Sequence, residues 1–308
     1  MNIRNALADA MQAPNDNIRN YHILSLGAGV QSTALYLMLS GGGMVTDGKP
    51  ARLDAAIFAD TGEEPDAVYA HLKWLQGLNG SQILVRSKGG RLGEHLKHGV
   101  NSTGQRFASI PVYTMAAGDK REGRTRRQCS REYKSAVVER AIRREILGLK
   151  PRQRIPKDAH VMHYFGISLD EAGRARRIAE RFRRDIKWAT PVFPLIDLGM
   201  TRAACRTYLA EHVPHTVRRS SCVFCPYHSD SEWLRLKEHD TNGWDRAVEI
   251  DRALRVPGNI VNRNMDKQLF LHRSCEPLED VQFSVSDDPR EAQLSLGFVA
   301  ECEGMCGV

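Results

Sequence analysis

The sequence contains no apolar run that approaches the roughly 18–20 residues a helix needs to cross a membrane. Its first residues, MNIRNALADAMQAPNDNIRN, also lack the apolar core of a secretory signal peptide. We therefore expect a cytoplasmic protein with no membrane partner. In a reducing cytosol, the seven cysteines are expected to be metal ligands, reactive thiols or core residues rather than disulfides.

Two widespread nucleotide-binding motifs are missing as well. No G-x-x-x-x-G-K-[ST] sequence is present, which excludes the P-loop of ordinary NTPases. The early glycine-rich stretch YHILSLGAGVQSTAL does not fit G-x-G-x-x-G, because Ser32 stands at the position of the third glycine. Any phosphate-binding loop in this chain must therefore be of another kind.

The pattern of apolar runs predicts an α/β fold. Short buried strands are expected at 23–26, 53–59 and 82–85, and helical patterns lie between them, which is the alternation of parallel βαβ units. Residues 87–128 are rich in Gly, Arg and Ser and are expected to be irregular. Further elements are predicted as helices at 135–147, 171–184 and 201–212 and a strand at 161–167.

Composition divides the chain into four parts, and no internal repeat is found. The predicted parts are an N-terminal extension (1–20), an α/β domain (21–200), a small helical region with a Cys-x-x-Cys pair (201–283) and a polar linker with a cysteine-containing tail (284–308).

The positive charge is concentrated in one segment. The chain has a net charge of +7, and residues 119–154 alone contain thirteen Lys or Arg and five Asp or Glu, a surplus of eight. Such a run is either a solvated face or a surface for phosphate groups. Because GDKREGRTRRQCSREYK has Tyr133 as its one aromatic residue, it favours phosphate attraction over base stacking. The partner would be tRNA or DNA.

The stretch YHILSLGAGVQSTAL reads as a buried strand, a glycine turn and a helix. Such a turn can place backbone N–H groups around an anion, or it can be a tight turn without a ligand. Gly27 and Gly29 would permit a positive φ, and Ser32 could donate a hydroxyl. The next strand ends in FADTGEEP, which places Asp60–Glu63 at the same sheet edge, where ligands of parallel sheets bind.

Together, LSLGAGVQSTAL and FADTGEEP resemble the PP-loop superfamily of adenine-nucleotide α-hydrolases, and within it the phosphoadenosine phosphosulfate (PAPS) reductase group. The resemblance implies a Rossmann-like fold that binds ATP or a sulfonucleotide. Gln31 stands where ATP-hydrolysing members carry Asp, and an amide lacks the charge that Mg²⁺ favours, which weakens the case for ATP cleavage. Mg²⁺ is kept as a candidate cofactor. The nucleotide-binding residues implied here are Ser25, Gly27, Ala28, Gly29, Val30, Gln31, Ser32, Asp60, Thr61, Gly62 and Glu63.

Two later segments continue the resemblance. RRQCSREYKSAVVERAIR is similar to the Cys-x-x-x-x-Lys helix start of the reductase group, which implies a catalytic role for Lys134. FGISLDEAGRAR is similar to the segment that approaches the phosphates or sulfate of the nucleotide in that family. It adds Gly166, Asp170, Glu171 and Arg174 to the implied nucleotide site.

The sequence SSCVFCPYH places Cys222 and Cys225 in Cys-x-x-Cys spacing. Alone, this pair is a metal or cluster site, a redox dithiol or two core cysteines. The resemblance extends to PP-loop enzymes that thiolate tRNA on three-cysteine clusters. It implies a [4Fe–4S] cluster on Cys129, Cys222 and Cys225, with zinc as the alternative. The fourth ligand would be Cys275, Cys302 or Cys306.

The tail AECEGMCGV carries the last two of these cysteines. Reductases of the family use a catalytic cysteine in a C-terminal Glu-Cys-Gly motif, which Glu301-Cys302 and Cys306-Gly307 each match in part. Cys302 and Cys306 are therefore candidate nucleophiles, and the sulfur atom of Cys205 is expected in the core.

Three functions follow as hypotheses. In the first, ATP activates an acceptor, for example a nucleic-acid base, and sulfur then replaces AMP. In the second, a tail thiolate attacks a sulfonucleotide, with a thiol reductant as a further partner. The alternative of another class is a non-catalytic nucleotide- or nucleic-acid-binding module with a structural zinc site.

Overall fold

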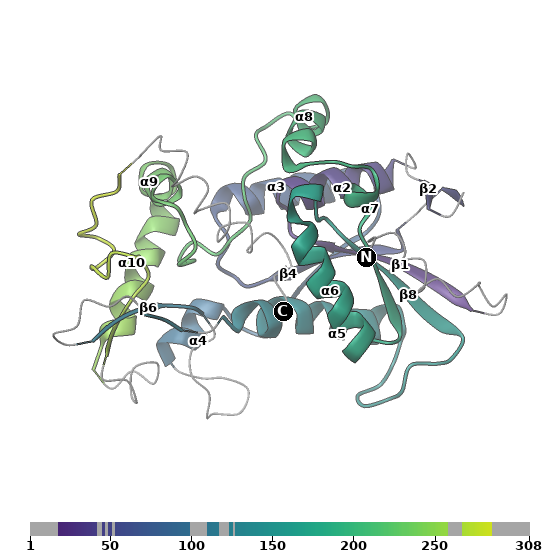
Figure 1. Cartoon of the computed structure of the whole chain (residues 1–308), viewed down its shortest axis with the longest axis horizontal. Coiled ribbons are helices and arrows are strands. Elements are labelled where there is room, and N and C mark those ends of the chain that lie inside the picture. Colours follow the sequence, from purple (N-terminus) through teal and green to yellow (C-terminus); the bar gives the residue numbers. More distant parts are fainter. Residues whose placement is uncertain are drawn as a thin grey trace.

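The computed structural model of the chain describes residues 18–41, 45–46, 49–50, 53–98, 110–116, 123–125, 127–257 and 267–284 (Figure 1). The predicted linker and tail, including Cys302 and Cys306, lie outside these ranges except for Ser284. Among the described helices, none combines the length and the apolar character of a membrane span.

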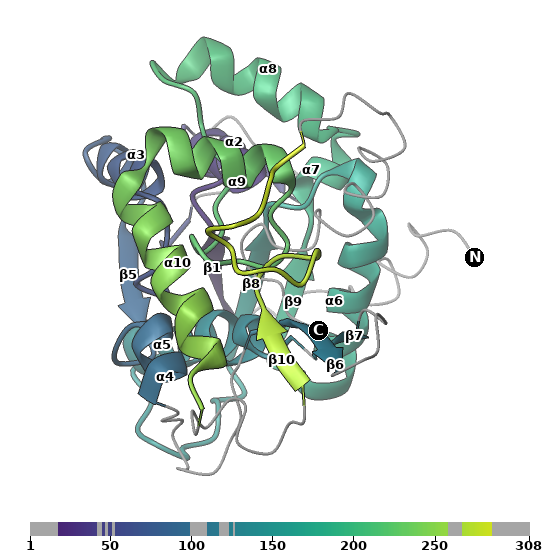
Figure 2. The same cartoon turned by 90° about the vertical axis from the view of Figure 1, so that its left-hand side faces the viewer.

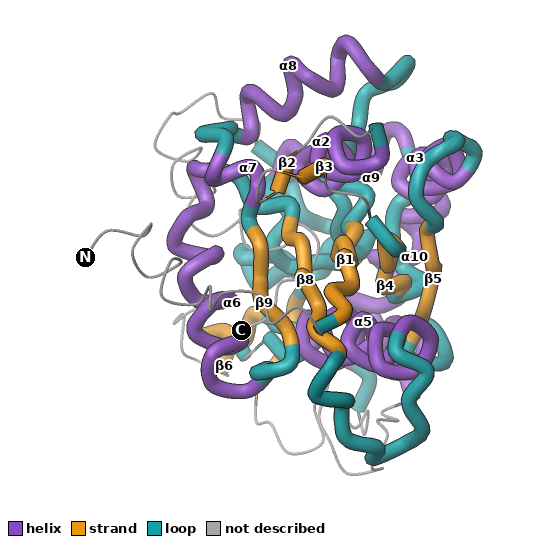
Figure 3. The backbone as a smooth tube through the Cα atoms, turned by 90° about the vertical axis from the view of Figure 1, so that its right-hand side faces the viewer, coloured by secondary structure: helices purple, strands orange, loops and turns teal. Residues whose placement is uncertain are grey.

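A parallel five-stranded sheet forms the centre of the fold, which confirms the predicted α/β class (Figure 3). The strand order is β5-β4-β1-β8-β9. The chain moves outward from β1 to β4 and β5, then returns to β8 on the other side of β1, so the strand order reverses between β1 and β8. Ligands of such sheets bind at the carboxyl ends of the strands beside this reversal. The strands are β1 (Arg19–Leu26), β4 (Ala55–Asp60), β5 (Ile83–Ser87), β8 (Ala159–Phe165) and β9 (Ala189–Val192).

Helices cover both faces of the sheet (Figure 2). Alternate residues of its central strands are therefore buried on opposite sides, each against its own group of helices. Leu24 and Phe58 pack with one group of helices, and Ile23 and Ile57 with the other. The first group is α2 (Val30–Ser40), α3 (Asp66–Gln76), α7 (Pro194–Asp197) and α8 (Arg202–His212). The second is α5 (Ala136–Ala141) and α6 (Ala172–Asp185).

A smaller unit lies beside the sheet and has its own apolar core around Trp233 (Figure 1). It contains α9 and α10 of the region predicted at 201–283, whereas α8 of that region packs on the parallel sheet. It also contains a three-stranded antiparallel sheet, of order β10-β6-β7, that the sequence analysis missed. Residues 87–128 are correspondingly not irregular throughout, since they contribute one helix and two strands. The elements are α4 (Leu92–His98), β6 (Tyr113–Ala116), β7 (Gly123–Arg124), α9 (Asp230–His239), α10 (Thr241–Arg255) and β10 (Lys267–Phe270). Elsewhere β2 (Val45–Thr46) and β3 (Lys49–Pro50) form a short hairpin.

The helix predicted at 135–147 begins earlier and is not a regular α-helix. Two π-helical segments, η1 (Ser130–Ser135) and η2 (Ile142–Ile146), flank α5. A 3-10 turn, η3 (Leu169–Glu171), precedes α6. The predicted start of α8 is confirmed, because Thr201 Oγ1 accepts a hydrogen bond from Ala204 N at 3.2 Å.

Buried histidines make the stability of this fold depend on pH. His71 lies 2.9 Å from Thr33 Oγ1 and 2.8 Å from His215, and burial with the neighbouring His215 lowers its pKa to about 4. Burial and the charge of Arg181 lower the pKa of His163 to about 3. In the unfolded chain both groups titrate near pH 6.5. Below that pH the unfolded chain binds protons that the folded protein does not.

We expect the free energy of unfolding to be largest above pH 6.5 and to fall between pH 6.5 and 4, by about 1.4 kcal/mol per pH unit for each buried histidine. Urea unfolding measured across this range checks it. His71→Gln should make the slope shallower, and His239→Gln, at a site whose side chain is 68% exposed, should not. Equal slopes for all three proteins would contradict the role of His71.

Candidate nucleotide site and cysteine cavity

Ser32, in the first turn of α2, closes the loop after β1. Ser32 Oγ accepts hydrogen bonds from Gly27 N and Gly29 N, each at 3.2 Å. The expectation that Gly27 or Gly29 adopts a positive φ is wrong, because the left-handed residue is Ala28, at φ 56°, whereas Gly29 has φ −98°. A phosphate oxygen entering this loop must compete with the serine hydroxyl for the backbone N–H groups.

Gly166 lets the end of β8 approach the first turn of α2. A Cβ atom at this position would lie 2.6 Å from Ser32 Cα and 2.7 Å from Ser32 N, which no side chain can accommodate. The two loops at the reversal of strand order are therefore in backbone contact. The resemblance implied a ligand role for Gly166, and the structure provides a packing reason for the same glycine.

Gln31 points its amide at a carboxylate. Its Nε2 donates to Glu171 Oε2 at 2.7 Å and to Ser168 Oγ at 3.3 Å, and Glu171 Oε1 accepts from Arg174 Nη1 at 3.1 Å. Gln31 is 1% exposed, and its Oε1 has no hydrogen-bond partner among the residues that the structure describes. The predicted residues Gln31, Glu171 and Arg174 are thus brought together at the reversal point, in one buried chain of polar contacts.

The other predicted residues of the two loops have mixed positions. Ser25 is buried and its Oγ lies 2.6 Å from His163 Nε2, so it packs under the loop. Val30, the first residue of α2, is buried in the core. Asp170 is exposed and its Oδ1 accepts from Arg202 N at 3.1 Å, which places it at the start of α8.

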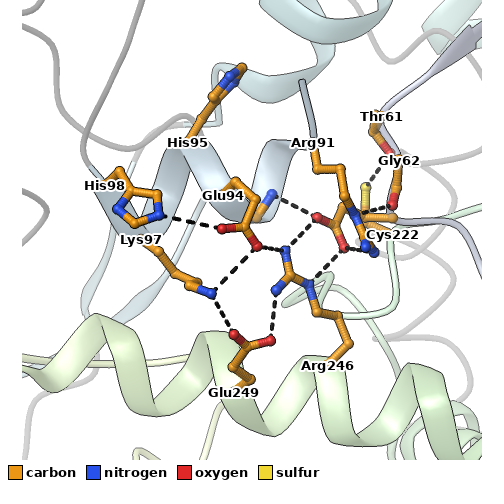
Figure 4. A network of polar contacts seen from close by, with 12 residues as sticks. Thr61, Gly62, Arg91, Glu94, His95, Lys97, His98, Cys222, Arg246 and Glu249 are labelled. Atoms are coloured by element: carbon orange, nitrogen blue, oxygen red, sulfur yellow. Dashed lines mark hydrogen bonds and ion pairs between the residues drawn. The ribbon is translucent and has the colours of Figure 1, made fainter. Parts of the chain in front are cut away.

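The turn after β4 carries the second predicted motif. Asp60 Oδ1 accepts from Gly62 N at 2.7 Å and from Tyr69 OH at 2.8 Å, which holds the turn closed. Gly62 has φ 74°, a conformation that favours glycine. Thr61 Oγ1 lies 3.2 Å from Cys222 Sγ, so this turn is the junction between the sheet edge and the Cys-x-x-Cys segment (Figure 4).

Glu63 is the centre of a buried ion-pair network, whereas the resemblance implied a nucleotide contact. Its carboxylate is 0% exposed and accepts from Arg246 Nη2 at 2.9 Å, from Arg246 Nε at 3.1 Å and from Gly93 N at 2.9 Å. Arg91 contacts it at 3.2 Å. Figure 4 shows Arg246 reaching from α10 toward Glu94 of α4. The network holds these two helices of the smaller unit against the turn after β4.

The three predicted cysteine ligands meet at one cavity. Cys129, Cys222 and Cys225 all line a space of about 460 Å³ that includes its open mouth. Cys225 N donates to Cys222 O at 2.9 Å, which closes the tight turn between these two residues. The other lining residues are mainly apolar, with two cations among them: Thr61, Leu92, Ile110, Pro111, Arg127, Ser130, Lys134, Ser221, Phe224, Pro226 and Tyr227.

The π-helical turn explains why Cys129 and Lys134 both reach this cavity. In a π-helix the backbone bonds run from residue i to i+5, so residues five apart lie near one another on the same face. Ala136 N accordingly donates to Arg131 O. A regular α-helix would turn the side chain of residue i+5 away from that of residue i.

Lys134 lies between the cysteine cavity and the loop after β1, which we call the nucleotide loop (27–29). It also lines a second cavity of about 230 Å³ beside Gly27, together with Ser220. Its Nζ lies 3.4 Å from Glu64 Oε1, and Glu64 Oε2 accepts from Ser220 Oγ at 2.9 Å. Glu64 is 4% exposed. The sequence analysis named Glu63 and missed Glu64, although the doubled acid in GEEP could have suggested it.

The chemistry of the thiols suits a bound metal cluster. Burial, reinforced by the negative charge of Glu64, raises the pKa of Cys222 well above that of an ordinary thiol. A redox dithiol needs the opposite shift, whereas a metal centre deprotonates its cysteine ligands. Within the described parts of the chain, no three His, Cys, Asp or Glu side chains converge on the position of a single metal ion. Three cysteines around one cavity are a candidate ligand set for a cluster, in which each thiolate binds a different iron.

Of the three candidates for a fourth ligand, the described residues include Cys275 alone, and it does not line the cavity. Cys275 is buried in the smaller unit. Cys302 and Cys306 lie outside the described residues. Cys205 is fully buried in the core, as predicted.

Comparisons with known proteins provide little beyond this geometry. No protein-family model matches the sequence, and no curated protein matches it. One solved structure with a partial likeness is that of the U34-tRNA thiolase NcsA from Methanococcus maripaludis with its [4Fe-4S] cluster. The TM-score is 0.37 at 14% sequence identity, covering 81% of this chain and 76% of that chain. The functional assignments below therefore rest on the residues of this protein.

The contact between Gln31 and Glu171 leads to a prediction about Mg²⁺. Gln31→Glu keeps the shape but places two carboxylates about 2.7 Å apart in a buried site. Without Mg²⁺ the variant should lose about 2–3 kcal/mol of unfolding free energy at pH 7, which Mg²⁺ restores by binding between the two acids. Thermal melting with and without MgCl₂ checks this, with the wild type as the Mg²⁺-insensitive control. A variant that does not respond to Mg²⁺ would refute a cation position between these side chains.

The Glu63 network leads to a prediction about stability. Glu63→Gln removes the charge that faces Arg246 in a fully buried position and should cost about 3 kcal/mol, the low end for such pairs because Arg246 keeps Glu94 and Glu249. The matched control is Glu180→Gln, which removes an exposed pair with Arg176 and should cost under about 0.5 kcal/mol. Urea unfolding measures both. Equal losses would mean that Glu63 does not hold the smaller unit in place.

Proposed function

We propose that this protein is an ATP-dependent sulfur transferase that binds an adenine nucleotide at the loop after β1 and an iron–sulfur cluster in the cysteine cavity. The observation that carries the proposal is the shared Lys134, which lines both the cavity beside Gly27 and the cavity of the three cysteines. Two sites that share a wall can pass an atom from one to the other. A nucleotide sensor would need no such contact.

The nucleotide end favours ATP over a sulfonucleotide for one reason. The sequence has Gln31 where an acid is expected, but Glu171 places a carboxylate 2.7 Å from the Gln31 amide. The charged oxygen that Mg²⁺ requires would then come from the loop after β8 instead of from α2, once Mg²⁺ displaces the Gln31 amide from Glu171 Oε2, while Arg174 keeps Glu171 Oε1. MgATP can then be held with its phosphates toward the N-terminus of α2, where the helix dipole favours an anion.

The cysteine end would hold the cluster through Cys129, Cys222 and Cys225. When bound, a cluster with three protein thiolates offers one iron with an open position for a sulfur atom. The chain itself contributes the apolar walls of Leu92 and Ile110, which limit access of water. Lys134 and Arg127 contribute positive charge that balances the anionic thiolates.

The reaction proposed here is redox-neutral. A carbonyl oxygen of the acceptor attacks the α-phosphorus of ATP, and the bond to the bridging oxygen breaks to release pyrophosphate. Sulfide then forms a bond to the activated carbon, the C–O bond breaks and AMP leaves with the oxygen. Lys134, held by Glu64 at 3.4 Å, stabilises the negative charge that develops on the phosphate.

Labelled nucleotides test the proposal directly. The protein, purified without oxygen, should convert α-labelled ATP to AMP and pyrophosphate in the presence of sulfide and unfractionated tRNA. Labelled PAPS should be left intact. Formation of bisphosphoadenosine from PAPS would instead assign a reductase, and binding of ATP without turnover would assign the non-catalytic module.

The thiols provide an independent prediction. Cys222→Ser should reduce the iron and acid-labile sulfide content by at least about ten-fold, because a hydroxyl is a poor ligand for a cluster iron. Cys205→Ala, which changes a core cysteine of α8, should keep the full content. Metal analysis and the visible absorption of protein purified anaerobically measure it. An unchanged iron content in the Cys222 variant would refute the ligand assignment.

A further inference from the structure

A strongly basic surface lies at the amino-terminal ends of β1, β8 and β9. The loop after β1 lies at the opposite, carboxyl ends of these strands. Lys157 precedes β8 by two residues and Lys187 precedes β9 by two residues. The starts of these two strands are neighbours, since Val161 pairs with Ala189 and Val161 N donates to Trp188 O at 3.2 Å. Arg19 joins them, with its backbone N donating to Asp158 O at 2.7 Å.

Two further segments extend this surface. The connection after η2 packs back on the helix end, because Arg143 Nη2 donates to Gln153 O at 2.6 Å and Leu149 N donates to Arg143 O. The C-terminal end of α6 leads directly into β9. We define the edge patch as the exposed cations of these segments: Arg19, Arg144, Lys150, Arg152, Arg154, Lys157, Arg183, Arg184 and Lys187.

The edge patch has a large surplus of positive charge. It contains nine basic side chains, and the exposed acids within the same segments are Glu145, Asp158 and Asp185. Glu145 is already paired with Arg86, and Asp185 with the neighbouring Arg184. A surplus of six within a few short segments is close to the net charge of +7 of the whole chain. Such a concentration costs repulsion energy unless an anionic partner neutralises it.

This surface differs from the segment expected from the sequence. The sequence left residues 119–154 as either a solvated face or a phosphate-binding surface, but Arg127 and Lys134 of that run line the cysteine cavity. The part after residue 143 joins α6 instead, at the far edge of the sheet. The folded chain therefore divides the basic run between two places.

The composition of the edge patch indicates the class of partner. Six of its nine cations are arginines, whose planar guanidinium groups bind phosphate oxygens in a bidentate manner. Ile18 is the one large exposed apolar side chain among the described residues of these segments, far less than the apolar face of a membrane-binding helix. The cations are spread over several segments rather than gathered in one pocket, which suits a repeating polyanion.

We propose that the edge patch binds the phosphate backbone of a folded nucleic acid whose reacting nucleotide lies at the opposite edge of the sheet. This deepens the proposed function and rests on it for the identity of the acceptor. The seven residues of β8 span about 23 Å at 3.3 Å per residue, so contacts at both edges require a partner at least that wide. A duplex or stem-loop can span that distance along its length as a rigid body, whereas a short single strand would have to wrap around the sheet.

Charge reversal of the edge patch tests the proposal. The full-length triple variant Arg154→Glu, Arg183→Glu, Lys187→Glu is compared with a matched triple on other surfaces, Lys73→Glu, Arg206→Glu, Arg235→Glu. All six residues are exposed and both variants change the net charge by the same amount. Fluorescence anisotropy with a labelled RNA hairpin, and with the DNA hairpin of the same sequence, is measured from 50 to 200 mM salt.

The edge variant should bind either hairpin at least about ten-fold more weakly at 100 mM salt, and its log–log salt slope should be smaller by about 3, one for each lost phosphate contact. The matched variant should stay within about three-fold of the wild type. Equal weakening of both variants, or wild-type binding to vesicles of anionic lipid but to neither hairpin, would overturn the proposal.

The same proteins separate this proposal from the proposed function. ATP binding and iron content are measured on both variants and should equal those of the wild type, because no edge-patch residue lines either cavity. Normal hairpin binding with no turnover of ATP would count against the transferase and leave the edge patch intact. The neutral variant Arg154→Gln, Arg183→Gln, Lys187→Gln should show an intermediate loss, which excludes a folding defect as the cause.

Discussion

The carboxylate of Glu63 determines where the smaller unit meets the sheet. It is fully buried, and it binds Arg246 of α10 and the backbone of α4 together. The backbone carbonyl oxygen of Glu63 accepts a hydrogen bond from Val223 N at 2.7 Å, directly beside Cys222. A buried carboxylate is tolerated only when cations and N–H groups satisfy it, so this geometry has little freedom to vary. The side chain of Glu63 thus fixes α4 and α10, and its backbone carbonyl fixes the Cys-x-x-Cys turn against the same turn after β4.

The two halves of the site depend on local departures from regular structure. The π-helical turn at η1 brings Cys129 and Lys134 to one cavity, and the left-handed Ala28 shapes the loop that Ser32 closes. Both conformations are less favourable than their regular alternatives and need support from their surroundings. The tight approach of Gly166 to Ser32 provides such support for the loop. Regular helices and strands alone would not bring these groups together.

Apolar periodicity was sufficient to predict four of the five strands of the parallel sheet, all but β9, and most of its helices, because buried strands and amphipathic helices have distinct periods. It failed for β6, β7 and β10, which are two to four residues long. β10 pairs with β6 across more than 140 positions of the chain, whereas β6 and β7 pair locally. The meeting of Cys129 with Cys222 and Cys225 was expected from the resemblance and could not follow from spacing. Glu63 and Glu64 illustrate the limit best, since adjacent acids of the same type face different cations and only the fold distinguishes them.

Under the proposed function, Lys134 would make the two cavities thermodynamically dependent on one another. Its ammonium group is shared between the Glu64 carboxylate, the nucleotide loop and the cysteine cavity. If a phosphate draws this cation toward Gly27, the cysteine cavity loses part of its positive potential, and an anionic group bound there is held less tightly. Linkage requires the reverse effect to have the same size. One side chain would then set the order of events, so that nucleotide binding weakens the hold on a negatively charged sulfur donor at the moment the acceptor is activated.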